Sequence, residues 1–360
     1  MTEVDKNSIL EALRSVEDPD LRRDIVSLDF VKSVKLCGGV AAVTIELTTP
    51  ACPVKDQLKE QARQAILALP GIEEARVEMT ARVRPSTSGS PSVLSEVKNT
   101  VLVGSGKGGV GKSTVSANLA VALARSGAEV GLMDADVYGP TIPTLFGVSE
   151  KPESGSKNRI RPVNCDGLKL ISMGFFLPKE KAVIWRGPML DKMMTQFLTG
   201  VEWGELDYLI IDLPPGTGDI QLSLCQKVPL TGAVVVSTPQ DVALNVAKKS
   251  ISMFNQLNTP ILGLVENMSY YVCNHCGKRE DIFGSGGARL TSEKMNIPFL
   301  GEIPLSKNIR EYSDQGKLIV QVEPDSEQAK AFVHVAEHMA AQISMRNMAG
   351  ASEENIKISF

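Results

Sequence analysis

The chain has 360 residues, of which 43% are hydrophobic and 22% are charged, and its formal net charge is −4. This composition is typical of a globular protein large enough for two domains, and the acidic balance argues against a general nucleic-acid-binding protein. There is no run of about 18 apolar residues and the first residues are polar and acidic, which argues against a membrane span and a secretory signal. We therefore expect a cytoplasmic protein with no membrane or nucleic-acid partner, whose cysteines are thiols or ligands.

Residues 1–83 predict a small α+β domain. Helical spacing of apolar residues covers 7–16, strand-like runs cover 30–36 and 40–47, a second helix covers 53–69 and a third strand covers 72–79. Cys52 lies where the second strand meets the second helix, a position at which helix N–H groups lower the pKa of a thiol. Two interpretations stay open for Cys52, a reactive auxiliary thiol or a small buried residue that packs a turn.

A stretch rich in Ser, Pro and Gly follows, and we place a linker at 84–98. Residues 99–345 alternate strand-like and helix-like segments, with strands predicted at 100–104, 129–134, 168–172, 208–212, 233–237, 261–266 and 299–303. Several are continuous apolar runs, as expected for strands covered on both faces. The chain is therefore predicted to be α/β, with a doubly wound, mainly parallel sheet in this domain. The polar residues 346–360 are expected to form a flexible tail.

The first strand of the larger domain runs into a glycine-rich loop and then a helix-like segment. Gly106, Gly111, Lys112 and Ser113 satisfy the P-loop pattern G-x-x-x-x-G-K-[ST]. Backbone N–H groups of such a loop cradle phosphate, the lysine reaches the β- and γ-phosphates, and the serine hydroxyl can ligate Mg²⁺. The residues predicted to bind the nucleotide are Gly106, Lys107, Gly108, Gly109, Val110, Gly111, Lys112, Ser113 and Thr114.

Two further strand ends carry carboxylates that should meet at the same edge of the sheet. Asp134 and Asp136 close the second strand and can hold Mg²⁺ through water and position an attacking water. Asp212 closes the strand 208–212 and is a predicted Mg²⁺ ligand, and Gly216 in the turn that follows is placed to sense the γ-phosphate. No guanine-specific Asn/Thr-Lys-x-Asp sequence follows at a late strand end, which favours ATP over GTP.

Cys273 and Cys276 form the only C-x-x-C sequence of the chain. Two thiolates at this spacing can hold one metal ion or one edge of a cluster, whereas a tetrahedral centre needs four ligands. Three interpretations stay open: a redox dithiol, half of a zinc site, and a four-cysteine site completed by the second subunit of a dimer.

The loop from Lys107 to Thr114 resembles the deviant Walker A loop of the MinD-like ATPases. The resemblance implies a nucleotide-sandwiched homodimer in which Lys107 reaches across to the partner subunit. It also implies that Lys107, Lys112 and Asp136 act in catalysis and that Asp136 activates water. Asp134 is then a nearby supporting carboxylate, and Asn267 contacts the base.

From about residue 5 to 345, the chain resembles the Mrp-type iron–sulfur cluster carriers, whose small N-terminal domain is associated with iron–sulfur assembly. The motifs that carry the resemblance are the P-loop, 133–140, 211–219, 266–269 and the C-x-x-C pair. It implies an ATPase that binds ATP, Mg²⁺ and a labile [4Fe–4S] cluster, the latter between Cys273 and Cys276 of both chains. Expected partners are a second copy, upstream scaffold proteins and the apo-proteins that receive the cluster. The alternatives are a partitioning or positioning ATPase and a zinc-stabilised nucleotide-binding scaffold.

Overall fold

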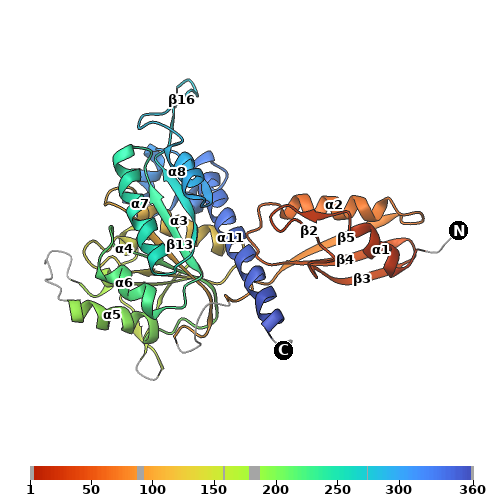
Figure 1. The fold of residues 1–360 in the computed structure, drawn as a ribbon, viewed down its shortest axis with the longest axis horizontal. Coiled ribbons are helices and arrows are strands. Elements are labelled where there is room, and N and C mark those ends of the chain that lie inside the picture. The colour runs from red at the N-terminus through yellow and green to blue at the C-terminus, as the bar shows by residue number, and fades with distance from the viewer. Residues whose placement is uncertain (1–3, 87–92, 157–158, 178–186, 274, 358–360) are drawn as a thin grey trace. The chain divides into compact units, whose positions relative to one another are not determined.

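The computed structural model describes residues 4–86, 93–156, 159–177, 187–273 and 275–357. Figure 1 shows the fold. The chain divides into two compact units, one made of Met1–Arg84 with Ser344–Phe360 and the other of Pro85–Ile343. No helix in the described ranges combines the length and the hydropathy that a membrane crossing requires.

The smaller unit has one layer of helices on one sheet. Helices α1 (Lys6–Leu13) and α2 (Lys55–Leu67) pack against the sheet β3 (Val31–Cys37), β4 (Val40–Leu47) and β5 (Glu74–Ala81). β4 is central, antiparallel to β3 and parallel to β5. Alternate residues of β4 are buried against the helices, so the period-two pattern of this strand gives the unit its core. The short strands β1 (Glu17–Asp18) and β2 (Arg23–Asp24) form a separate pair.

The last helix, α11 (Glu327–Lys357), runs through most of the segment that the sequence predicts as a flexible tail. Within the smaller unit, Asn347 is 5% exposed and its Nδ2 donates to the Arg84 carbonyl at 3.0 Å. Met348 packs against the core of the same unit, and the hydroxyls of Ser344 and Thr48 share a hydrogen bond. These contacts attach residues 344–348 of the helix to the rest of the smaller unit.

The larger unit is built on an eight-stranded sheet with the order β10-β11-β7-β12-β6-β13-β14-β17. All neighbours are parallel except β10 and β11, and helices flank the sheet (Figure 1), which confirms the predicted fold class. The three residues of β10 carry no periodic signal, and this strand is absent from the sequence prediction. The strands are β6 (Val97–Ser105), β7 (Val130–Asp134), β10 (Val163–Cys165), β11 (Leu168–Ser172), β12 (Leu206–Asp212), β13 (Gly232–Ser237), β14 (Ile261–Asn267) and β17 (Phe299–Ile303).

The helices of the larger unit cover strands that are buried along most of their length. Helix α3 packs against the central strands β6, β7 and β12, α7 packs against β13, and α8 packs against β14. The helices are α3 (Lys112–Arg125), α4 (Ile142–Leu145), α5 (Gly187–Thr199), α6 (Asp219–Lys227), α7 (Asp241–Gln256), α8 (Gly287–Met295), α9 (Lys307–Asp314) and α10 (Ile319–Val322), with the 3-10 helix η2 (Met173–Phe175). Two short hairpins, β8 (Glu153–Ser154) with β9 (Ile160–Arg161) and β15 (Tyr271–Val272) with β16 (Arg279–Glu280), lie outside the main sheet.

Strand register brings the predicted site residues together. Asp212 at the end of β12 is paired with Asp134 at the end of β7 and with Val103, two residues before the end of β6. Asp134 is paired in turn with Ser172 at the end of β11. The P-loop and the carboxylates therefore leave the same edge of the sheet side by side, where ligands of open parallel sheets bind.

Candidate nucleotide site and cysteine pair

The P-loop conformation depends on its glycines. A Cβ on Gly106 would lie 2.5 Å from the carbonyl carbon of Val246 in α7, so only glycine fits against that backbone. Gly109 and Gly111 have φ of +80° and +78°, which favour glycine. Helix α3 then begins at Lys112, and its N-terminal N–H groups and dipole favour an anion at this end.

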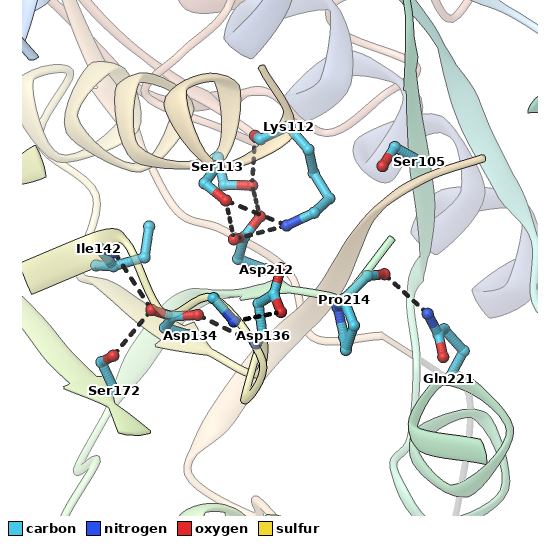
Figure 2. Close-up of polar contacts among 12 residues, drawn as sticks. Ser105, Lys112, Ser113, Asp134, Asp136, Ile142, Ser172, Asp212, Pro214 and Gln221 are labelled. Atoms are coloured by element: carbon cyan, nitrogen blue, oxygen red, sulfur yellow. Dashed lines mark hydrogen bonds and ion pairs between the residues drawn. The ribbon is translucent and has the colours of Figure 1, made fainter. Parts of the chain in front are cut away.

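The side chains that follow the loop converge on one buried carboxylate (Figure 2). Asp212 is fully buried, and its Oδ2 lies 2.8 Å from the Lys112 Nζ and accepts from the Ser113 Oγ at 2.6 Å. Its Oδ1 accepts from the Ser116 Oγ at 2.6 Å. Lys112, which is expected to bind phosphate, and Ser113, which is expected to bind the metal ion, thus share Asp212 as a partner. This partner keeps both side chains next to the P-loop.

Asp134 is surrounded by hydrogen-bond donors. It is fully buried, and its carboxylate accepts from the backbone N–H groups of Asp136 at 3.1 Å and Ile142 at 3.2 Å and from the Ser172 Oγ at 2.8 Å. Burial, with the nearby charge of Asp212, raises the pKa of Asp134 to about 7. Both oxygens accept from these donors (Figure 2), so Asp134 fixes the loop after β7.

Asp136 faces a pocket. It lines an open pocket of about 450 Å³ together with Tyr138, Pro215 and Gln221. Its carboxylate accepts from the Gly139 N–H at 3.2 Å, and burial raises its pKa above the usual range. The two aspartates of the same strand end are therefore distinct, because Asp134 is enclosed by donors whereas Asp136 can meet a ligand.

The loop after β12 is braced by a glutamine that the sequence did not mark. Gln221 is 2% exposed, and its Nε2 donates to the carbonyls of Pro214 at 2.8 Å and Gly216 at 3.2 Å. The Gly216 N–H, expected at the γ-phosphate, donates instead to the Ser105 carbonyl at 2.8 Å. This N–H would have to leave Ser105 to contact a phosphate. Lys107 is exposed.

Asn267 lies against the P-loop. It ends β14, is 6% exposed, and its Nδ2 donates to the Val110 carbonyl at 2.8 Å. A Cβ on Gly111 would come within 2.2 Å of the same Nδ2, a further reason for glycine there. The predicted base contact is thus adjacent to the phosphate loop.

The oxygen donors of this site suit a hard cation. The Ser113 hydroxyl and the Asp212 carboxylate lie 2.6 Å apart, and Asp136 contributes a further carboxylate from the loop that follows the neighbouring strand β7. Hydroxyl and carboxylate oxygens are the ligands that Mg²⁺ takes beside phosphates, so the residues present fit this ion.

The C-x-x-C pair lies on the hairpin β15–β16, which projects from the larger unit (Figure 1). Cys276 is exposed and Cys273 is partly exposed. Hydrogen bonds from the N–H groups of His275 and Cys276 lower the pKa of Cys273, which favours its thiolate. Among the described residues, no group of three or more His, Cys, Asp or Glu side chains could hold a metal ion. In the smaller unit, Cys52 is partly buried and packs against the core.

Comparison with protein families and known proteins places the site in context. Residues 96–340 match the model described as NUBPL iron-transfer P-loop NTPase, and residues 6–79 match the model described as iron–sulfur cluster assembly protein. The chain is 48% identical over 349 residues to the iron–sulfur cluster carrier protein of Deinococcus radiodurans, covering 97% of this chain and 98% of that one. It is 40% identical to the protein of the same name from Escherichia coli, covering 92% and 90% of the two chains.

Among solved structures, a nucleotide-binding protein in complex with ADP from Archaeoglobus fulgidus matches with a TM-score of 0.59 and 42% identity, covering 66% of this chain and 93% of that one. The cell division ATPase MinD of Pyrococcus furiosus matches with a TM-score of 0.52 and 25% identity, covering 67% and 98%. The P-loop and the acidic strand ends agree with these matches, which cover nearly the full chain. The chain belongs to the family of NUBPL iron-transfer P-loop NTPases.

Proposed function

We propose that this protein is an ATP-hydrolysing iron–sulfur cluster carrier that holds a labile [4Fe–4S] cluster between two copies of the chain and transfers it to apo-proteins. The observation that carries the proposal is the combination, in one unit, of a complete P-loop site and a projecting pair of cysteines. The relatives named as iron–sulfur cluster carriers support it.

On the nucleotide side, the phosphates of ATP replace Asp212 as the partner of the Lys112 ammonium, 2.8 Å away in this structure. Ser113, Asp212 and Asp136 are the proposed Mg²⁺ ligands, and the ion neutralises charge on the phosphates. Asp136, which faces the pocket, orients and activates the attacking water. Lys107 is exposed at the loop, and we place it on the phosphates of the partner subunit, where a cation stabilises the transition state.

On the cluster side, one chain supplies two thiolates at the hairpin, and a [4Fe–4S] cluster takes four. Two copies related by a twofold axis supply Cys273 and Cys276 twice. The exposure of Cys276 suits a cargo that is received from a scaffold protein and released to a client. Cys52 of the smaller unit is proposed only as an auxiliary thiol.

The test is anaerobic reconstitution with iron and sulfide, followed by transfer to an apo-protein that needs a [4Fe–4S] cluster. The double variant Cys273→Ser/Cys276→Ser should lose cluster absorbance and transfer, whereas Cys37→Ser, which changes another exposed thiol, should retain both. Cluster binding by the double variant would refute the cluster site, and purification with zinc in place of iron would favour the scaffold alternative. Separately, Asp136→Asn should lower ATP turnover by at least about tenfold while nucleotide still binds.

A further inference from the structure

The root of the cysteine hairpin is held by a buried glutamate that plays no part in the nucleotide site. Glu266 is fully buried. Its Oε1 accepts from the Ser269 Oγ at 2.6 Å and from the Gly286 N–H at 3.2 Å. Its Oε2 accepts from the Ala288 N–H at 2.7 Å. Ser269 precedes the hairpin β15–β16, whereas Gly286 and Ala288 follow it, so one carboxylate fastens both ends of the cysteine-bearing segment.

The next residue fastens the phosphate loop. Asn267 donates to the Val110 carbonyl at 2.8 Å and touches the P-loop at Gly111. Successive side chains of a strand point to opposite faces of the sheet. The last two residues of β14 therefore hold the P-loop on one face and the root of the cysteine hairpin on the other.

The strand end that joins the two contacts pairs with both neighbouring strands. Glu266 is in register with Ser237 of β13 and with Glu302 of β17, and Asn267 is in register with Ile303. The chain then turns at Met268, which has a φ of +54°, and the Ser269 N–H donates to the Ile303 carbonyl at 2.9 Å. Val110 on the P-loop is thus linked to the hairpin by the Asn267 hydrogen bond, the peptide bond between Asn267 and Glu266, and the hydrogen bonds of the Glu266 carboxylate.

We infer that Glu266 and Asn267 are positioning residues that couple nucleotide occupancy of the P-loop to the geometry of Cys273 and Cys276. The inference rests on the proposed function, because it assigns a role to the cysteine pair. Phosphate binding reorders the loop that contains Val110, Asn267 follows its carbonyl, and Glu266 moves with Asn267 and carries both ends of the hairpin. Neither residue has to touch the cluster for this coupling to act.

The test measures iodoacetamide alkylation of Cys273 and Cys276 in the full-length, cluster-free chain by peptide mass spectrometry. Rates are compared with and without a non-hydrolysable ATP analogue and Mg²⁺, and nucleotide affinity is measured for every variant. In the wild type, nucleotide should change the alkylation rate by about fivefold or more, the lower end of typical coupling between sites. In Glu266→Gln, the amide NH₂ faces a group that donates to the Glu266 carboxylate, so one hydrogen bond is lost. The ratio of alkylation rates with and without nucleotide should then fall below about twofold, with nucleotide affinity retained.

Two further variants make the result specific. Ser269→Ala removes a single hydrogen bond to Glu266 and should reduce the nucleotide response even where Glu266→Gln does not fold. Glu302→Gln is the matched control. It weakens the contact of Arg279 Nη2 with Glu302 Oε2, 3.2 Å apart, which braces the hairpin from β17, and it removes none of the donors to the Glu266 carboxylate. This variant should keep the wild-type ratio.

The inference is overturned if the wild type binds nucleotide without a change in alkylation, if the folded Glu266 and Ser269 variants keep the wild-type ratio, or if Glu302→Gln loses the ratio as well. These outcomes are independent of the proposed function, which fails only if reconstitution shows no cluster on Cys273 and Cys276. A protein that binds the cluster but shows no nucleotide response would refute the coupling alone.

Discussion

Replacement of Lys112 by methionine tests the buried ion pair at the centre of the site. The Lys112 side chain is 6% exposed and Asp212 is fully buried, so the substitution leaves a buried carboxylate without its cation. Breaking a buried pair by removing one partner costs about 3–5 kcal/mol. Asp212 keeps the hydroxyls of Ser113 and Ser116, each at 2.6 Å, and we therefore expect about 3 kcal/mol, the lower end of that range.

The assay is urea unfolding of the nucleotide-free protein, followed by tryptophan fluorescence. Trp203 is buried in the larger unit, so its fluorescence reports the unfolding of that unit. The double variant Lys112→Met/Asp212→Asn should be destabilised by at least about 1 kcal/mol less than the sum of the single variants, because it removes both charges. Lys227→Met serves as control, since its pair with Asp191 is 41% and 47% exposed and should contribute less than about 1 kcal/mol.

Additive effects in the double variant, or a Lys112→Met variant no less stable than Lys227→Met, would refute the argument. Either result would mean that the carboxylate of Asp212 does not depend on the lysine in the nucleotide-free protein.

The remaining predictions concern the loops around this pair. Asp134 has a folded pKa of about 7, above its unfolded value of 3.8, so its contribution to stability falls as pH rises between about 4 and 7, by at most about 1.4 kcal/mol per pH unit. When unfolding is measured at pH 5 and pH 7, the free energy of unfolding should change less with pH in Asp134→Asn than in the wild type. Gly106→Ala should unfold at lower urea than Gly108→Ala, because the added Cβ meets Val246 backbone at 2.5 Å in the first case and only Pro215 Cγ at 3.9 Å in the second; equal midpoints would contradict the packing argument. Ser172→Ala should cost about 2 kcal/mol in the same assay, since its hydroxyl donates to the buried Asp134 and accepts from the Gly174 N–H; an unchanged stability would show that Asp134 is held without it.

Much of the fold follows from local signals in the sequence. Strand-like segments, several of them continuous apolar runs, predict the seven parallel strands of the sheet, and the glycine spacing before Lys112 predicts the P-loop, because each signal depends on neighbours in the chain. The short edge strand β10 has no such signal, and the contacts that Asn347 and Met348 of α11 make within the smaller unit join residues far apart in the sequence.

The site residues that the sequence missed are those whose role comes from a different strand or helix. Ser172 reaches Asp134 through the pairing of β11 with β7, and Gln221 reaches Pro214 from the first turn of α6. Asp134 and Asp136 look equivalent in the sequence, and only the donors around Asp134 separate a structural carboxylate from one that faces the pocket. For Glu266, which follows a buried run directly, the sequence gives no sign of the segment that it holds.

The measurement that tests the central claim most directly is native mass spectrometry of the anaerobically reconstituted protein, combined with iron and sulfide analysis. We predict a dimer that carries one four-iron, four-sulfide cluster, and a Cys273→Ser/Cys276→Ser variant that carries none. Iron bound with equal stoichiometry to a monomer, or retained by the double variant, would contradict a cluster shared by the two cysteine pairs.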